Sequence, residues 1–152
     1  METSLNIRDT WATPPDFRKA IVNAFGFPDL DVCASKTNYF GHNFYDEAMD
    51  GLKQPWKKNV FCNPPGSEVA KWVRKAASEP TRSLVLVQQG LETEWYHEAK
   101  TRCITLLLTP RIQFIPPFGI PKSSNPRNYM LLVFEPWMAK LPKERIETWR
   151  WK

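Results

Sequence analysis

The chain has 152 residues, a length that fits one globular domain. Hydrophobic residues make up 42% of it and charged residues 24%, which argues against a disordered or fibrous protein. The net charge of +5 is unevenly spread: residues 1–50 hold 4 Lys and Arg against 8 Asp and Glu, and residues 51–152 hold 17 against 8. The basic part suits a polyanion and the acidic part a small cationic ligand, unless both are simply solvated surface.

Nothing in the sequence predicts a membrane segment, a targeting signal or a metal site. The longest apolar runs, such as Tyr129–Phe134, are far below the roughly 18 residues that a membrane span needs. The polar start of the chain is unlike a signal peptide. Cys33, Cys62 and Cys103, with two histidines, match neither a disulfide framework nor a zinc pattern. We therefore expect a cytoplasmic protein with reduced thiols and no bound metal.

The first predicted helix begins after Thr13. The run from Thr13 to Asp16 combines a capping hydroxyl, prolines in the first turn and an acid near the positive end of the helix dipole. Apolar side chains then recur on one helical face, and Gly26 ends the helix. The residues of that face are Phe17, Ala20, Ile21 and Phe25.

Short apolar runs alternate with helical patterns along the rest of the chain. The predicted strands are residues 30–34, 59–62, 83–88, 103–108 and 129–134, and the further helices are residues 67–78 and 93–100. Continuous runs rich in Val and Leu, separated by helices, are typical of a largely parallel sheet with helices on both faces. The predicted fold class is therefore α/β.

Residues 110–126 are expected to form a long surface loop. They contain five prolines, which neither a helix nor a central strand tolerates. Long loops in small domains are often functional, and this region mixes cations with aromatic rings, as nucleic-acid interfaces do. The candidate nucleic-acid contacts in and beside this loop are Arg111, Phe118, Lys122 and Arg127.

The turn Asn63-Pro64-Pro65 directly follows a predicted strand. Two consecutive prolines fix the backbone and remove two donors, so the carbonyls of Asn63 and Pro64 and the Asn63 side-chain oxygen form a rigid cluster of acceptors. Such a cluster suits a planar amino group. Accepting both of its hydrogens leaves the nitrogen lone pair able to attack an electrophile such as the methyl group of S-adenosylmethionine. The alternative is that the prolines only end the strand.

Five motifs follow one another along the chain: Trp11-Ala12-Thr13-Pro14, Leu30 to Ser35, Asp50-Gly51-Leu52 with Trp56, Asn63-Pro64-Pro65, and Arg111-Ile112-Gln113-Phe114. In this order they resemble the phage-type Dam-like DNA adenine-N6-methyltransferase family. The resemblance spans residues 9–134. It implies a compact Rossmann-like, S-adenosylmethionine-dependent methyltransferase fold in residues 1–139. Residues 140–152 would be a basic C-terminal tail, either frayed or a phosphate-binding arm.

The resemblance also implies roles for individual residues. Asn63, Pro64 and Pro65 would hold the amino group of adenine. A carboxylate, Asp46 or Asp50, would bind the ribose of the cofactor, and the two remain open alternatives. The other residues implied to bind S-adenosylmethionine are Trp11, Thr13, Pro14, Asp31, Ala34 and Ser35, of which the last three would form the floor under its methionine moiety.

One position departs from the family pattern. The family places an aromatic ring after Asn-Pro-Pro, where it stacks on the extruded base, and this chain has Gly66. Either Phe118 or Phe61 supplies the ring, or catalysis is weakened or lost. We expect an S-adenosylmethionine-dependent enzyme that methylates adenine N6 in DNA, in the bacterial host cytoplasm if it is phage-encoded. The alternatives are a catalytically silent DNA-binding module and an enzyme acting on another nucleobase amino group.

Overall fold

The structure is a computed structural model that describes residues 12–116, 127–136 and 140–152. Its helices are α1 (Pro15–Phe25), α2 (Val69–Ser78) and α3 (Glu94–Ala99), with a 3-10 helix, η2 (Gly66–Glu68), before α2. Its strands are β1 (Leu30–Asp31), β2 (Asn43–Phe44), β3 (Asn59–Cys62), β4 (Arg82–Gln88), β5 (Ile104–Thr109), β6 (Tyr129–Phe134) and β7 (Arg145–Arg150). Within the described ranges, no helix has the length and apolar character to cross a membrane.

All seven strands join one mixed sheet in the order β2-β1-β3-β4-β6-β5-β7. Strands β2, β1, β3 and β4 run parallel to one another, and β5 is parallel to β7. Strand β6, however, runs antiparallel to both β4 and β5. The α/β class is confirmed, but a largely parallel sheet is not. A continuous apolar run indicates a strand buried on both faces and leaves its direction open.

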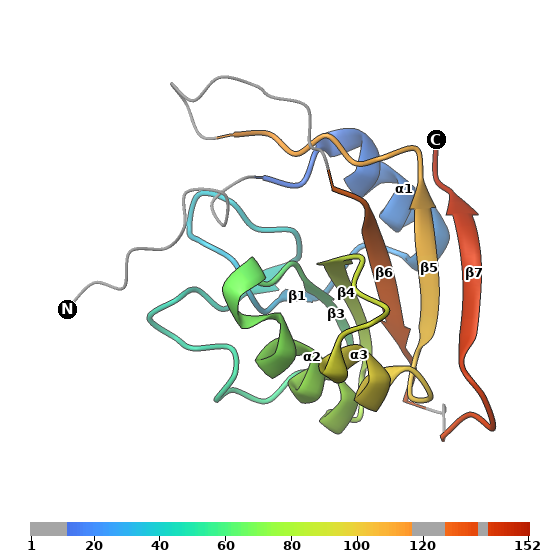
Figure 1. Cartoon of the computed structure of the whole chain (residues 1–152). Coiled ribbons are helices and arrows are strands. Elements are labelled where there is room, and N and C mark those ends of the chain that lie inside the picture. The colour runs from blue at the N-terminus through green and yellow to red at the C-terminus, as the bar shows by residue number, and fades with distance from the viewer. Residues whose placement is uncertain (1–11, 117–126, 137–139) are drawn as a thin grey trace.

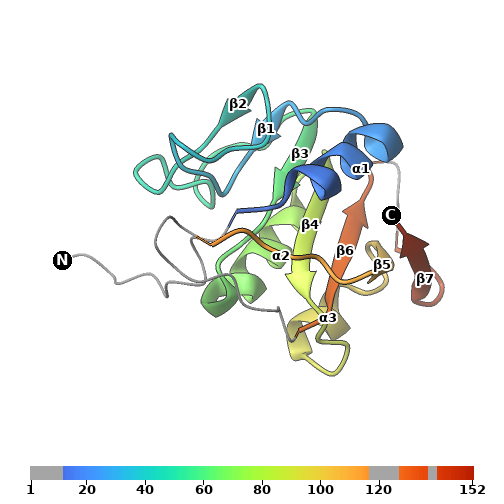
Figure 2. The ribbon, with the colours of Figure 1, turned by 90° about the horizontal axis from the view of Figure 1, so that it is seen from above.

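Helices cover both faces of the sheet, as Figures 1 and 2 show. On one face, Phe17 and Ile21 of α1 pack against residues such as Phe61 and Leu86. On the other face, α2 and α3 cover a second cluster, which contains Trp72 together with alternate residues of the same strands. Successive side chains of a strand point to opposite faces, so each central strand contributes to both clusters.

The start of α1 differs from the expectation. The residue that caps the helix is Pro14, and no side chain caps it, so the prediction that the Thr13 hydroxyl does so is wrong. Thr13 is 6% exposed and its hydroxyl accepts a hydrogen bond from Asn63 instead. Gly26 ends the helix as predicted, with a φ of 89° that favours glycine.

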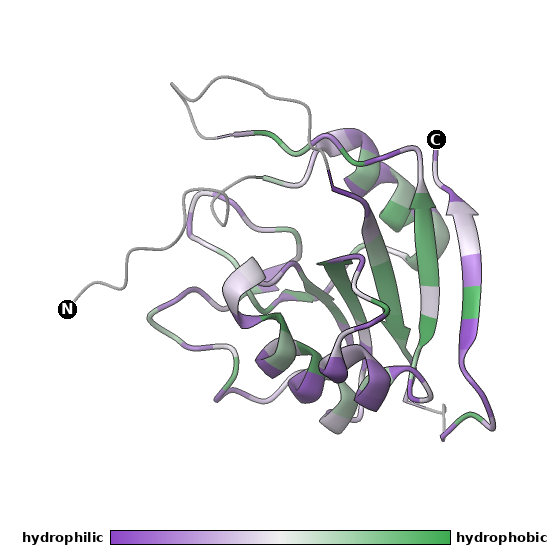
Figure 3. Cartoon of the chain, viewed as in Figure 1, coloured by the Kyte–Doolittle hydropathy of each residue, from purple (hydrophilic) through white to green (hydrophobic). Residues whose placement is uncertain are grey.

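Residues 145–150 were assigned to a tail by the sequence and form the edge strand β7 in the structure. This strand pairs in parallel with β5 over its whole length, from Ile104↔Arg145 to Thr109↔Arg150, so it is not frayed. Most of its side chains are exposed, and Figure 3 shows it mostly hydrophilic beside the hydrophobic central strands. The division of the chain at residue 139 stays a prediction, and the sheet extends beyond it.

Candidate active site

The carboxyl ends of six strands meet at one edge of the sheet. Strands β2, β1, β3 and β4 are parallel to one another. Strand β5 points the same way as β4 because both are antiparallel to β6, and β7 is parallel to β5. In the strand order β2-β1-β3-β4, the chain leaves β1 toward one side and returns on the other. Ligands of open α/β sheets bind outside the carboxyl ends of the strands at such a switch point. The segments that follow β1 and β3 flank it.

The Asn63-Pro64-Pro65 turn follows β3 at this switch point. Asn63 is partly buried, and its Nδ2 donates a hydrogen bond of 3.3 Å to Oγ1 of Thr13, 50 residues earlier. This bond joins two of the sequence motifs in one site. Because Nδ2 is directed at Thr13, the carbonyl end of the amide faces away from it. Pro64 is buried and Pro65 partly buried, which fixes the turn in place.

Asp31 ends β1 and is 5% exposed. Its carboxylate accepts hydrogen bonds from the backbone amides of Phe40, at 2.8 Å, and Cys33, at 3.2 Å. Burial raises the pKa of Asp31 to about 6, while these bonds and the nearby Arg18 oppose the rise. In this position the carboxylate organises the backbone that follows β1.

The segment after β1 is a turn that returns to β2. Ala34 donates its backbone N–H to Tyr45 O at 3.0 Å, and Ser35 and Asn38 form an isolated bridge. Arg18 of α1 holds the turn from outside, because its Nη2 donates to Asn38 Oδ1 at 2.8 Å. Ala34 and Ser35 therefore lie in the turn beside the switch point, and their role in binding the cofactor stays a prediction.

The two candidate ribose ligands lie in the loop after β2. Asp46 follows the carboxyl end of β2 and accepts from the Met49 amide at 3.0 Å. Asp50 accepts from the Leu52 amide at 3.2 Å, and its carboxylate also lies 3.8 Å from Lys53 Nζ. Each carboxylate therefore stabilises its own turn.

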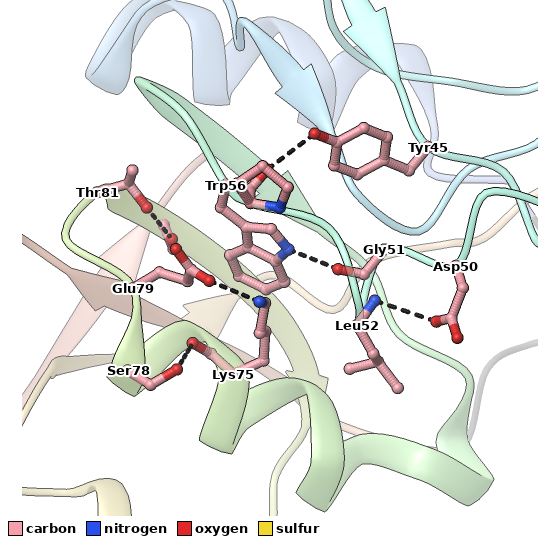
Figure 4. A network of polar contacts seen from close by, with 11 residues as sticks. Tyr45, Asp50, Gly51, Leu52, Trp56, Lys75, Ser78, Glu79 and Thr81 are labelled. Carbon is pink, nitrogen blue, oxygen red and sulfur yellow. Dashed lines mark hydrogen bonds and ion pairs between the residues drawn. The ribbon is translucent and has the colours of Figure 1, made fainter.

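The Asp50-Gly51-Leu52 and Trp56 motif closes this loop onto the end of β1. Trp56 is buried and its Nε1 donates to Gly51 O at 2.9 Å (Figure 4). A Cβ at Gly51 would collide with the carbonyl oxygen of Val32, so only glycine allows the loop to approach β1 this closely. The motif is a structural support of the site.

Of the two rings suggested by the sequence, Phe118 lies outside the described residues, and Phe61 does not lie over the Asn-Pro-Pro turn. Phe61 is 1% exposed and packs against Phe40 with ring centroids 5.0 Å apart, so the expectation that it covers the base is wrong. An aromatic residue within a strand is held by the core on its own face. The sequence reasoning overlooked Tyr129, which begins β6 at the same edge and contacts Phe114 with ring centroids 4.7 Å apart.

The candidate nucleic-acid residues lie partly within the described structure. Arg111 lines a surface hollow of about 340 Å³ together with Pro14, Trp151 and Lys152. Arg127 precedes β6, and its Nη1 donates to Gln88 Oε1 at 3.0 Å. Both arginines are exposed and lie at the edge where the strands end. Trp11, Phe118 and Lys122 lie outside the described residues, so their roles stay predictions.

A mixed α/β sheet with an Asn-Pro-Pro turn at its switch point, and exposed arginines at the same edge, is compatible with the class of enzymes that transfer groups to nucleic-acid bases. The family model described as DNA N-6-adenine-methyltransferase (Dam) matches residues 1–149. The chain belongs to this family and is an adenine-specific DNA methyltransferase. A comparison with curated proteins found no match. DNA is therefore its substrate and a methyl donor its second substrate, whereas a phage origin stays a prediction.

Proposed function

We propose that S-adenosylmethionine is the methyl donor and that it binds at the switch point between β1 and β3. The hydrogen bond between Asn63 and Thr13 carries this proposal, because it joins the Thr13-Pro14 segment to the Asn-Pro-Pro turn beside the end of β1. A donor bound there would lie next to the group that holds its acceptor. Trp11, Thr13 and Pro14 would cover it from the α1 side.

The residues after β1 form the floor of this donor site in our proposal. Ala34 and Ser35 are small and close to the end of β1, so a ligand can approach their backbone. Asp31 supports this floor indirectly, because both of its carboxylate oxygens already accept hydrogen bonds from backbone amides. Its contribution is to hold the turn from Cys33 to Phe40 in shape, in place of the direct contact with the donor that the family resemblance implies.

For the ribose of the donor we favour Asp46 over Asp50. Asp46 follows the carboxyl end of β2, the strand next to β1, and the structure describes one contact of its side chain, to Met49. Asp50 is engaged by both Leu52 and Lys53. A carboxylate with acceptor capacity near the end of the neighbouring strand suits two ribose hydroxyls.

The Asn-Pro-Pro turn would bind and activate the adenine. The Asn63 side-chain oxygen and the Pro64 carbonyl accept the two hydrogens of the N6 amino group. This keeps the nitrogen lone pair available and directs it toward the donor site. Bound S-adenosylmethionine supplies an electrophilic methyl group. Donation from Asn63 Nδ2 to Thr13 keeps the amide from rotating, so its oxygen is already oriented when the base arrives.

We further propose that DNA lies along the edge where the strands end. Arg111 and Arg127 are exposed there, and the uneven distribution of charge makes this part of the chain basic. Phe118 and Lys122 would extend the same surface, and Trp151 and Lys152 add an aromatic ring and a cation beside Arg111. Phosphate contacts of this kind position the duplex without reading its sequence.

Asn63→Ala tests the proposed mechanism. Methyl transfer should fall at least about 100-fold while the Kd of S-adenosylmethionine changes little, because the lost interaction matters in the transition state. Asn63→Asp keeps an acceptor and should retain more activity than Asn63→Ala. Transfer of a radiolabelled methyl group to DNA and calorimetric titration of the donor measure the two quantities.

Asn43→Ala provides the control, since Asn43 is an exposed residue of the edge strand β2. It should behave as the wild type in both measurements. Undiminished methyl transfer by Asn63→Ala would mean that Pro64 and Pro65 only end β3, and the mechanism would be abandoned.

A further inference from the structure

Three polar or aromatic side chains lie on one face of the sheet at the edge where the proposed site lies. In β4, Leu84 and Leu86 belong to the core under α1 and Val85 and Val87 to the opposite core, so Gln88 points to the α1 face. The same alternation in β3 puts Asn63 on that face, in agreement with its bond to Thr13.

Tyr129 completes this group from β6. It pairs in register with Gln88 and packs against the core on the α1 face. Leu86, which is fully buried, precedes Gln88 by two residues on the same face of β4. Asn63, Gln88 and Tyr129 thus lie on one face of the sheet, at the same edge of the three adjacent strands β3, β4 and β6.

The spacing of these residues fits a nucleobase. Cys62 pairs with Val85, so Asn63 is level with Leu86 and Gln88 lies two residues further along the neighbouring strand. With strands about 4.8 Å apart and a rise of about 3.3 Å per residue, the Cα atoms of Asn63 and Gln88 are roughly 8 Å apart. Two amide side chains at this separation can reach the same edge of one base.

The Gln88 amide is oriented by Arg127. Arg127 Nη1 donates to Gln88 Oε1 at 3.0 Å, which assigns the acceptor end of the amide to the arginine. The donor end, Nε2, lies at the other end of the planar amide and points away from this contact. An arginine offers five donors, so this contact is compatible with a phosphate contact by the same residue.

We propose that Gln88, positioned by Arg127, donates a hydrogen bond to a ring nitrogen of the target adenine, N1 or N7. These two nitrogens flank the amino group, and both accept hydrogen bonds. The inference rests on the proposed role of Asn63. When the turn at Asn63 accepts the hydrogens of the amino group, the ring nitrogen beside that group is left as an acceptor. Gln88 then supplies the matching donor and helps select adenine as the base to be methylated.

Nitrogen-to-carbon substitution in the base tests this contact. An oligonucleotide carrying one adenine that the wild-type enzyme methylates is compared with versions bearing 1-deazaadenine or 7-deazaadenine at that position. Single-turnover methyl transfer by the wild type should fall about tenfold or more with one of the two analogues, because the Gln88 donor is left unpaired. Gln88→Leu should be slowed by a similar factor on adenine and should no longer distinguish adenine from that analogue.

Two further variants sharpen the outcome. Gln89→Leu changes the same residue type one position later and should keep the wild-type dependence on the analogue. Arg127→Ala should reduce the discrimination between adenine and the analogue, which loss of a phosphate contact alone would leave intact, since it weakens binding to both DNAs equally. Gln88 is exposed, so its replacement should leave the thermal unfolding temperature unchanged.

The inference is overturned if Gln88→Leu discriminates between adenine and both analogues as the wild type does, or if the wild type methylates all three bases at one rate. Failure of the underlying mechanism gives a different result. In that case Asn63→Ala transfers methyl groups at the wild-type rate to unmodified adenine.

Discussion

At the scale of single residues, the buried Asp31 shows how a motif residue can support a site without touching a ligand. Its two carboxylate oxygens bind the amides of Cys33 and Phe40, at the two ends of the turn that follows β1. The sequence identifies an acid at the end of a strand. Only the tertiary structure identifies its partners.

Asp31 should also make stability depend on pH. Its pKa is raised in the folded protein from 3.8 to about 6, so between these values the folded state binds the proton more tightly than the unfolded state. Its contribution to the free energy of unfolding is therefore full below about pH 4 and is lost as the pH rises through 6. A difference of about two pKa units corresponds to about 3 kcal/mol.

Urea unfolding of the wild type and Asp31→Asn at pH values from 4 to 7 measures this contribution. The unfolding free energy of the wild type minus that of Asp31→Asn should decrease as the pH rises, because only the wild type loses a bound proton at this position. Glu47→Gln, at an exposed position, serves as the control and should follow the wild type at every pH. Parallel pH profiles for the wild type and Asp31→Asn would contradict a raised pKa of the buried Asp31 carboxyl.

A second residue-scale prediction concerns the ribose ligand. Asp46→Ala should weaken S-adenosylmethionine binding about tenfold, since it removes the acceptor proposed for the ribose hydroxyls. Asp50→Ala should leave the donor Kd closer to the wild type, although it loses a turn contact with Leu52. Calorimetric titration of both variants decides between the two acids, and a larger effect at Asp50 would reverse the assignment.

At the scale of elements, close packing of loops on strands shapes the site. Trp56 and Gly51 close the loop after β2 onto the end of β1, and the indoles of Trp56 and Trp72 stack with centroids 6.3 Å apart. Gly51→Ala should therefore cost about 3 kcal/mol of folding stability, because its methyl group meets backbone that cannot move freely.

Gly90→Ala is the matched control for this prediction. There a Cβ would meet the flexible side chain of Thr93 at 3.0 Å, which can give way. It should cost less than about 1 kcal/mol. Equal unfolding midpoints for the two variants in urea would show that the Gly51 loop can move away from Val32.

At the scale of the whole molecule, the basic edge should control DNA binding. Each phosphate contact contributes about 0.9 to the slope of log affinity against log salt concentration. Arg111→Gln and Lys122→Gln should each lower the affinity and reduce that slope by about one contact. Fluorescence anisotropy with labelled DNA over a range of salt concentrations measures both quantities.

Lys57→Gln tests whether the effect is local. Lys57 is exposed and precedes β3, at the edge opposite the proposed site. Its replacement should leave the slope unchanged. A reduced slope for Lys57→Gln, with no change for Arg111→Gln, would move the DNA surface to the opposite edge.

Local patterns in the sequence were sufficient for the α/β class, for α1 and its buried face, for the strands β3, β4 and β6, and for the Asn-Pro-Pro turn. Burial and helical or strand periodicity are written into neighbouring residues, and prolines restrict the backbone wherever they occur. The family could be recognised for the same reason, since its motifs are short and local.

Contacts between distant segments were decided only by the tertiary structure. The antiparallel direction of β6, the polar strand β7, the bond from Asn63 to Thr13 and the pair of Gln88 with Arg127 all join residues far apart in the chain. Strand direction and register depend on which partners the whole fold brings together, and apolar runs look the same in either direction. Which side chain meets which is therefore settled by packing, after the local elements have formed.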